Sequence, residues 1–155
     1  MTITNAMRLL TQAGIPFEPR EYAWDEADLS GVHAAAAMGL DPDAAFKTLV
    51  LRGEKTGYFV CCIPVAAELD LKKAARATGD KKADMLHVKD LLGVTGYMRG
   101  GCAPVGMKKA FPTFFDETAQ IYERIAVSAG TRGQMLLLDP LALAAYIGAA
   151  FVDLV

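Results

Sequence analysis

The chain has 155 residues, of which 53% are hydrophobic, and its formal net charge at pH 7 is −2. This length is typical of one compact domain, and the apolar content is too high for a disordered protein. No apolar run approaches the ~18 residues of a membrane-spanning helix, and the first residues lack the basic start and apolar stretch of a signal peptide, so we expect one cytosolic domain over residues 1–155.

Capping residues, glycines and prolines divide the first half of the chain into short helices and strands. They predict a helix capped by Thr4 or Asn5 and ended at Gly14, an edge strand over 17–22, a helix from Ser30 to Gly39, and strands over 46–52 and 58–65. Asp41-Pro42 also has the pattern of a helix start. A turn at Gly53–Gly57 separates the last two strands, which should form a hairpin.

The second half continues in the same mixed order. It predicts helices over 71–77 after Asp70, over 88–92 up to Gly93 and from Asp139-Pro140 onward, and strands over 113–116, 123–128, 134–138 and 151–155. Helices and strands in this order indicate an α+β fold. We expect a single domain with a mixed, mostly antiparallel and barrel-like sheet flanked by helices.

Lys47 is the most informative single residue. Strand alternation places it on the same face as Leu49 and Leu51, in apolar company. Such a lysine either extends its ammonium to water or holds a positive charge at the floor of a half-buried pocket. In the second case the charge could anchor a phosphate or stabilise a developing oxyanion. The spacing alone leaves both interpretations open.

A glycine-rich loop covers residues 96–106, with four glycines and Pro104. Glycine lets main-chain N–H groups approach a ligand closely, but an ordinary tight connection between strands has the same composition. The loop lacks the Gly-Lys-Ser or Gly-Lys-Thr ending of a P-loop, so nothing indicates nucleotide hydrolysis.

Other catalytic groups have weaker signals. Ser128 is not in a Gly-x-Ser-x-Gly elbow, which argues against a serine hydrolase. Cys102 could act as a thiol nucleophile if His33 or His87 activated it, but no spacing links them. Three cysteines, two of them adjacent, suit neither a disulfide framework nor zinc, so we expect no metal and no cofactor.

The charges are unevenly distributed. Residues Glu18–Asp43 contain seven acids and one base, a net charge of −6. Residues Lys72–Asp90 contain six bases and three acids, a net charge of +3, and Lys108 and Lys109 follow. A basic face of this kind suits salt-dependent contact with RNA, although a solvated helix face gives the same pattern.

Four short sequence motifs follow one another along nearly the whole chain. They are Thr4-Asn5-Ala6 with Leu9-Leu10; Phe46-Lys47-Thr48-Leu49-Val50; Gly100-Gly101-Cys102-Ala103-Pro104-Val105-Gly106 with Lys108-Lys109; and Ser128-Ala129-Gly130 with Arg132-Gly133-Gln134. Together they resemble the YbaK/EbsC family of Cys-tRNA(Pro) deacylases, relatives of the prolyl-tRNA synthetase editing domain.

The resemblance implies a free-standing editing enzyme that hydrolyses mischarged tRNA, with Lys47 as the catalytic residue and the aminoacyl-tRNA 3′ end in the pocket. Prolyl-tRNA synthetase is a further candidate partner. The resemblance also implies that no metal is needed and that the substrate's own cysteine thiol helps attack the ester. The implied substrate-binding residues are Tyr22, Thr48, Gly100, Gly101, Cys102, Ala103, Pro104, Gly106, Ser128 and Gly130.

Three alternatives stay open. Family members often carry serine before the proline, where this chain has Ala103, so the amino acid removed could be alanine or serine. A non-catalytic module could instead bind tRNA ends or a synthetase through the Lys72–Lys89 face. The third alternative is the Cys102 thiol hydrolase.

Overall fold

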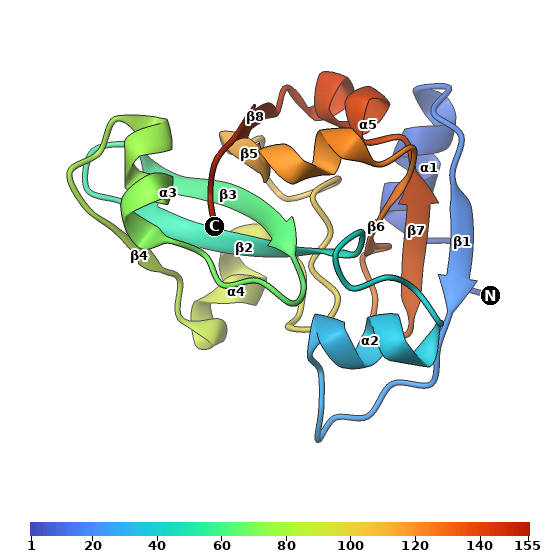
Figure 1. The fold of residues 1–155 in the computed structure, drawn as a ribbon. Helices are drawn as coiled ribbons and strands as arrows, with labels where there is room; N and C mark the ends of the chain where they lie inside the picture. The colour runs from blue at the N-terminus through green and yellow to red at the C-terminus, as the bar shows by residue number, and fades with distance from the viewer.

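The computed structural model describes residues 1–155 and confirms the α+β class (Figure 1). The helices are α1 (Asn5–Gln12), α2 (Gly31–Ala37), α3 (Leu71–Thr78), α4 (Val88–Thr95), α5 (Pro140–Ile147) and the 3-10 helix η1 (Glu117–Ile121). The strands are β1 (Glu18–Glu21), β2 (Phe46–Gly53), β3 (Gly57–Pro64), β4 (Ala83–Met85), β5 (Thr113–Asp116), β6 (Ile125–Ser128), β7 (Gln134–Leu138) and β8 (Ala150–Val152). No helix has the length and apolar character required to cross a membrane.

The strands form two sheets instead of one barrel-like sheet. The smaller has the order β1-β7-β6, and all its pairs are antiparallel. The larger has the order β4-β2-β3-β5-β8, antiparallel from β4 to β3 and parallel from β3 to β8. A single bridge between Ala45 and Ala126 joins the two sheets. Closure into a barrel does not occur, because no continuous ladder of paired strands runs around the core.

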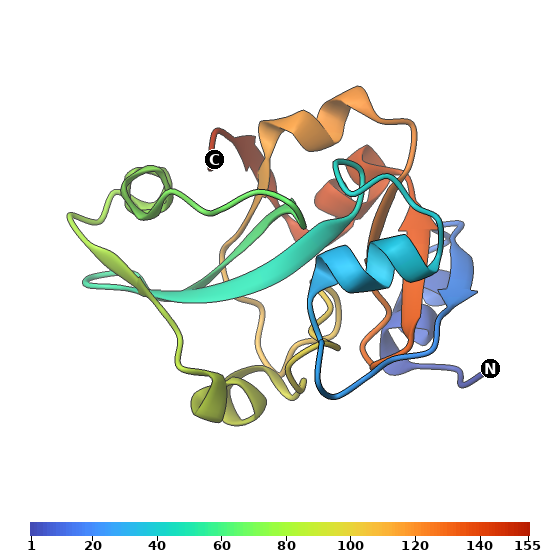
Figure 2. The same ribbon diagram turned by 60° about the horizontal axis from the view of Figure 1, so that its bottom comes forward.

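The expected hairpin is confirmed, with Phe46 opposite Pro64 at one end and Gly53 opposite Gly57 at the other. In Figure 2 it projects from the rest of the molecule between α3 and α4. The buried Asp80 carboxylate fixes its tip: it accepts hydrogen bonds from the main-chain N–H groups of Lys55 (2.7 Å) and Thr56 (3.1 Å) and from the Thr78 hydroxyl (2.5 Å). The Thr78 hydroxyl, followed by the groups of Thr56 and Lys55, holds the pKa of Asp80 well below its usual range.

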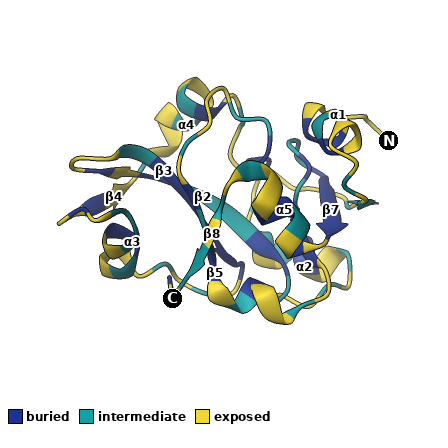
Figure 3. Ribbon diagram, turned by 90° about the horizontal axis from the view of Figure 1, so that it is seen from above, coloured by how far each residue is buried: buried dark blue, intermediate teal, exposed yellow.

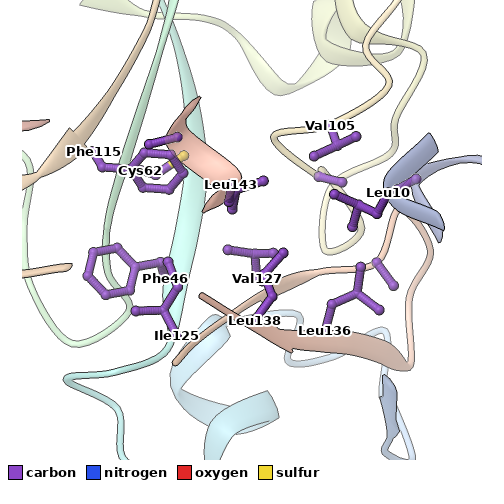
Figure 4. Close-up of a cluster of buried hydrophobic side chains, with 14 of the residues drawn as sticks. Leu10, Phe46, Cys62, Val105, Phe115, Ile125, Val127, Leu136, Leu138 and Leu143 are labelled. Atoms are coloured by element: carbon purple, nitrogen blue, oxygen red, sulfur yellow. The ribbon is translucent and has the colours of Figure 1, made fainter. Parts of the chain in front are cut away.

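The largest buried cluster lies between the two sheets, α1 and α5, as Figure 4 shows. Leu10 comes from α1, Leu143 from α5, and Phe46 and Phe115 meet edge to face with ring centroids 6.5 Å apart. Cys102, Ala103 and Val105 also belong to this cluster, so the glycine-rich loop is anchored in the core. Figure 3 shows the resulting pattern, with buried strand residues inside and exposed residues on the outer faces of the helices.

Local capping signals are confirmed at Thr4, Ser30, Asp70 and Asp139, each of which accepts a hydrogen bond from its own helix. The predicted end of α4 at Gly93 is wrong. The helix continues to Thr95, whose hydroxyl donates to the Leu91 carbonyl (2.8 Å), and it ends at Gly96, where φ is +87°.

Three further differences concern short segments. The helix start at Asp41 yields only one turn, closed by hydrogen bonds from the N–H groups of Ala44 and Ala45 to the Asp41 carbonyl. The terminal strand covers 150–152 instead of 151–155, and β4 and η1 were not predicted. Segments of three to five residues carry little periodic signal of their own, so tertiary pairing decides them.

Candidate active site

A cavity of about 320 Å³ lies beside the first half of β2. Its other walls come from α2, from the segment that leads through β4 into α4, and from the start of the glycine-rich loop. Most of the side chains that line it are apolar. This volume is at the lower end of the range for small-molecule sites, so the cavity suits a small ligand or one end of a larger one.

One edge of β2 is open toward this cavity. On that edge β4 pairs only with Leu51–Gly53, and the Leu86 N–H donates to the Val50 carbonyl at 3.0 Å. Main-chain groups of alternate residues in a strand point to the same side, so those of Thr48 point the same way as those of Val50. Thr48 lines the cavity, and no strand pairs with it on this edge, so its N–H and C=O can bond to a ligand there.

Lys47 is half-buried and lines the cavity. Burial lowers the pKa of Lys47 below its ordinary value, and the Glu68 carboxylate partly opposes that effect. None of the ion pairs of the protein includes Lys47. A partly desolvated ammonium with no carboxylate partner is available for an anionic ligand atom.

The first part of the glycine-rich loop forms the wall next to Arg99. Gly100 and Cys102 line the cavity, and their main-chain N–H groups donate to no acceptor of the protein. The Gly101 N–H, in contrast, donates to the Met98 carbonyl at 3.0 Å. Two of the three N–H groups at residues 100–102 are therefore available to a ligand.

The rest of the loop does not reach this cavity. Gly101, Ala103, Pro104, Gly106 and Gly130, all expected to bind substrate, do not line it. Pro104 and Gly106 line a separate hollow of about 280 Å³ that also contacts the end of α5.

Two of these glycines make room for Tyr97 instead. A Cβ on Gly106 would lie 2.8 Å from the Tyr97 hydroxyl oxygen, and one on Gly130 would lie 3.0 Å from its ring. The Tyr97 hydroxyl also donates to the Val105 carbonyl. The position of Gly106 and Gly130 is thus explained by packing within the protein.

Tyr22, Thr48 and Ser128, which the family resemblance implies as substrate-binding residues, line the cavity. The Ser128 hydroxyl accepts a hydrogen bond from the Gly130 N–H at 3.2 Å. Sequence reasoning missed Arg99 and the apolar residues of the opposite wall, which are Leu29, Met85, Leu86, Val88 and Leu91. For Arg99 and residues 85–91 the only signal was their proximity in sequence to the loop and to the basic segment, and Leu29 had no such signal.

Cys102 has no base beside it. Neither His33 nor His87 lines the cavity. His33 Nδ1 is 3.7 Å from the Asp28 carboxylate, and His87 lines a neighbouring hollow. Burial raises the pKa of Cys102 to about 12, so its thiol stays protonated near neutral pH. No three His, Cys, Asp or Glu side chains are grouped so that they could hold a metal ion.

The sequence and the fold match a known class of protein. The model of the aminoacyl-tRNA editing domain matches residues 28–146, and the chain belongs to this family.

Two individual proteins and one solved structure of this kind resemble the chain over most of its length. The chain is 49% identical over 151 residues to EbsC of Enterococcus faecalis, a candidate Cys-tRNA(Pro)/Cys-tRNA(Cys) deacylase, with 97% of this chain and 92% of EbsC covered. It is 28% identical over 107 residues to the uncharacterized protein YwhH of Bacillus subtilis, covering 69% and 68% of the two chains. A crystal structure of a candidate trans-editing enzyme for prolyl tRNA synthetase superposes with a TM-score of 0.83, at 26% identity over 99% and 98% of the chains.

Proposed function

We propose that this protein is a free-standing editing enzyme that removes the amino acid from mischarged tRNA, chiefly from Cys-tRNA(Pro). Membership of the editing-domain family and the 49% identity to EbsC support this substrate. The structural observation that carries the proposal is the unpaired Lys47 ammonium beside the open edge of β2 in a small cavity.

The protein's chemical contribution is to position the ester and to stabilise charge. When the ester carbonyl is attacked, its oxygen becomes negative, and the Lys47 ammonium and the Thr48 N–H lie on the strand that faces it. The unbonded N–H groups of Gly100 and Cys102, which also line the cavity, supply further donors. Donors fixed before the reaction in a partly dry site stabilise such an oxyanion far more than water does.

The attacking group comes from the substrate. The cysteine sulfur attacks its own ester carbonyl carbon, the bond to the tRNA ribose oxygen breaks, and the thiol proton ends on that oxygen. The products are free tRNA and a cyclic thioester of cysteine, which water then opens to cysteine. The raised pKa of Cys102 and the absence of a histidine from the cavity agree with a protein that supplies no nucleophile.

Substrate choice depends on the cavity wall and on the reactivity of the thiol, because size alone separates small amino acids poorly. Ala103 has no exposed surface and packs in the core, outside the cavity lining. A serine in place of Ala103 would therefore add no hydroxyl to the wall. Ala103 therefore gives no reason to replace cysteine as the substrate, and deacylation of alanyl- and seryl-tRNA remains the alternative activity.

Deacylation of Cys-tRNA(Pro) tests the proposal. We expect Lys47→Ala to lower the rate by about 10²- to 10³-fold, the usual effect of removing one oxyanion-stabilising group. Lys47→Arg should retain part of the activity. Lys55→Ala is the matched control, because Lys55 is exposed at the tip of the same hairpin. Equal rates for wild type and Lys47→Ala would remove Lys47 from the mechanism.

A panel of charged tRNAs in the same assay defines the substrate. Loss of cysteine, but not of alanine or serine, is the expected result. Faster loss of alanine or serine would identify the alternative substrate.

We also propose that residues 1–155 act together as one domain on the aminoacyl-tRNA 3′ end, with prolyl-tRNA synthetase as a candidate partner. Lys72, Lys81, Lys82 and Lys89 are exposed near the hairpin, as a docking surface for RNA or a synthetase requires. Binding of charged tRNA without loss of the ester would show that the chain is a binding module instead of an enzyme.

A further inference from the structure

The cavity is too small for more than the end of the proposed substrate. At about 320 Å³ it can hold the aminoacyl ester and its immediate surroundings, at the lower limit of small-molecule sites. The unpaired nucleotides that precede the 3′ residue must then lie outside it. Their binding site is to be sought where the cavity wall meets solvent.

Three residues, Trp24, Arg99 and Arg132, meet at one part of that rim. Arg99 lines the cavity and is exposed, and its carbonyl accepts a hydrogen bond from Nε of Arg132 at 2.9 Å. The Arg132 guanidinium carbon lies 5.4 Å from the ring centroid of Trp24. Trp24 is 48% exposed, so part of the indole is open to solvent.

The main chain ties this group to the cavity wall. The N–H of Tyr22, a cavity residue, donates to the Gly133 carbonyl at 2.9 Å. Gly133 has a φ of +87°, and a Cβ there would lie 2.9 Å from Cδ1 of Trp24. Only glycine at residue 133 lets the indole lie this close to the turn. The position of Trp24 relative to the cavity is therefore fixed by its neighbours.

The two arginines have no carboxylate partners, since no ion pair of the protein includes Arg99 or Arg132. Acids do occur nearby in the segment between β1 and α2. The Asp25 carboxylate accepts a hydrogen bond from the Ala27 N–H at 2.9 Å, and the Asp28 carboxylate accepts one from the Ser30 N–H at 3.1 Å. Glu26 is exposed. These carboxylates repel the closely spaced phosphates of an RNA duplex. Stacking on Trp24 is therefore the main attraction between RNA and this surface.

We infer that Trp24, Arg99 and Arg132 form a platform for the unpaired nucleotides next to the aminoacylated 3′ residue. A base stacks on the exposed part of the Trp24 indole, and the guanidinium groups bind the adjoining phosphates. Stacking on aromatic side chains together with arginine contacts is the usual chemistry of single-stranded RNA binding. The inference rests on the proposed function, because it takes the cavity as the site of the tRNA end.

Trp24 is the only tryptophan of the chain, so its fluorescence reports directly on the platform. The probe is a short, uncharged RNA with the sequence of a tRNA 3′ end. We expect this RNA to quench the fluorescence of the wild-type protein saturably, and a blunt RNA duplex of equal length to leave it unchanged. Because no ester is present, this assay is independent of deacylation and can succeed even if the proposed reaction fails.

Variants give the second measurement, with binding followed by the anisotropy of a dye-labelled copy of the same RNA. Trp24→Ala should weaken binding by about 5- to 150-fold, and Trp24→Phe should retain most of the affinity. Arg99→Ala and Arg132→Ala should each reduce the slope of log affinity against log salt by about 0.7. Arg8→Ala is the matched control, because Arg8 is exposed on α1 and has no ion pair.

Kinetics separate binding from chemistry. If Cys-tRNA(Pro) is the substrate, Trp24→Ala should raise KM and leave the single-turnover rate at saturating tRNA unchanged. Unaltered affinity in Trp24→Ala, together with unaltered salt slopes in both arginine variants, would overturn the inference. Quenching by prolyl-tRNA synthetase without any response to RNA would also overturn it and would identify a protein-docking surface.

Discussion

Gly101 packs directly on the main chain of Thr131: a Cβ on residue 101 would lie 3.0 Å from the Thr131 carbonyl carbon. Through this contact the loop that carries Gly100 and Cys102 rests on the turn that precedes β7. The same turn contributes the Gly133 carbonyl that holds Tyr22. One close approach of two loops therefore sets the relative position of two cavity walls.

Replacing Gly101 should disturb both walls. We expect Gly101→Ala to lower the free energy of unfolding by about 1–3 kcal/mol, the usual effect of an extra methyl group in a packed position. It should also slow deacylation, because the loop must move away from Thr131. Urea unfolding and the deacylation assay measure the two effects.

Gly93→Ala is the control for that change. Gly93 lies inside α4, and a Cβ there would have no other atom within 4 Å. Alanine should therefore stabilise the protein by about 0.5–1 kcal/mol. If Gly101→Ala proved as stable as Gly93→Ala, the contact with Thr131 would not be tight.

Lys47→Met should separate stability from activity. Burial disfavours the charged form of Lys47, as its lowered pKa shows, and an unbranched apolar side chain removes that penalty. We expect the melting temperature to stay the same or rise while deacylation is lost. A clear fall in melting temperature would mean that the Lys47 ammonium stabilises the fold.

The stability of the protein should decline at alkaline pH because of its buried thiols. Burial raises the pKa of Cys61 from 9.0 to about 12. Between these values the unfolded chain loses the thiol proton and the folded chain keeps it, so each pH unit lowers the free energy of unfolding by up to about 1.4 kcal/mol per thiol. Unfolding curves from pH 8 to 11 should show a weaker decline for Cys61→Ala than for wild type.

Reactivity gives an independent check on the cysteines. All three are buried, and only Cys102 lines the cavity. A thiol reagent at pH 8 should modify the native protein slowly and at Cys102 first, which mass spectrometry of peptides can locate. Earlier modification of Cys61 or Cys62 would contradict the arrangement of the hairpin.

Asp80→Asn should loosen the tip of the β2–β3 hairpin. The carboxylate accepts two main-chain hydrogen bonds and one from Thr78, and its pKa lies below the ordinary 3.8. Its contribution to stability is therefore present above pH 3.8 and is lost as the pH falls further. The melting temperature of the variant should be lower than that of wild type at pH 7, and the difference should shrink in acid. If the difference in melting temperature stayed constant as the pH fell, the effect of the substitution would come from altered packing or hydrogen bonding and not from the lost charge.

The local elements could be predicted from the sequence because their determinants are neighbours along the chain. Thr4, Ser30, Asp70 and Asp139 cap helices through hydrogen bonds within three residues. The β2–β3 hairpin likewise joins strands only a short turn apart. The identity of Lys47 as the central candidate came from strand alternation and from the family motifs around it.

Within the candidate site, the sequence could not tell which half of the glycine-rich loop faces the cavity. It is the half with Gly100 and Cys102, whereas Pro104 and Gly106 face a hollow on the other side. The reason is the packing of Gly101 on Thr131 and of Tyr97 between Gly106 and Gly130, contacts between residues far apart in the sequence.

What the sequence determined by itself is most of the longer helices and strands, the strand that carries Lys47 and the family motifs, since short-range hydrogen bonds and alternation decide them. The tertiary structure alone decided the two sheets, the open edge at Thr48 and the meeting of Trp24, Arg99 and Arg132. These depend on the pairing between β4 and β2 ending at Leu51 and on turns far apart in the sequence packing together, and no local pattern specifies where such long-range contacts form.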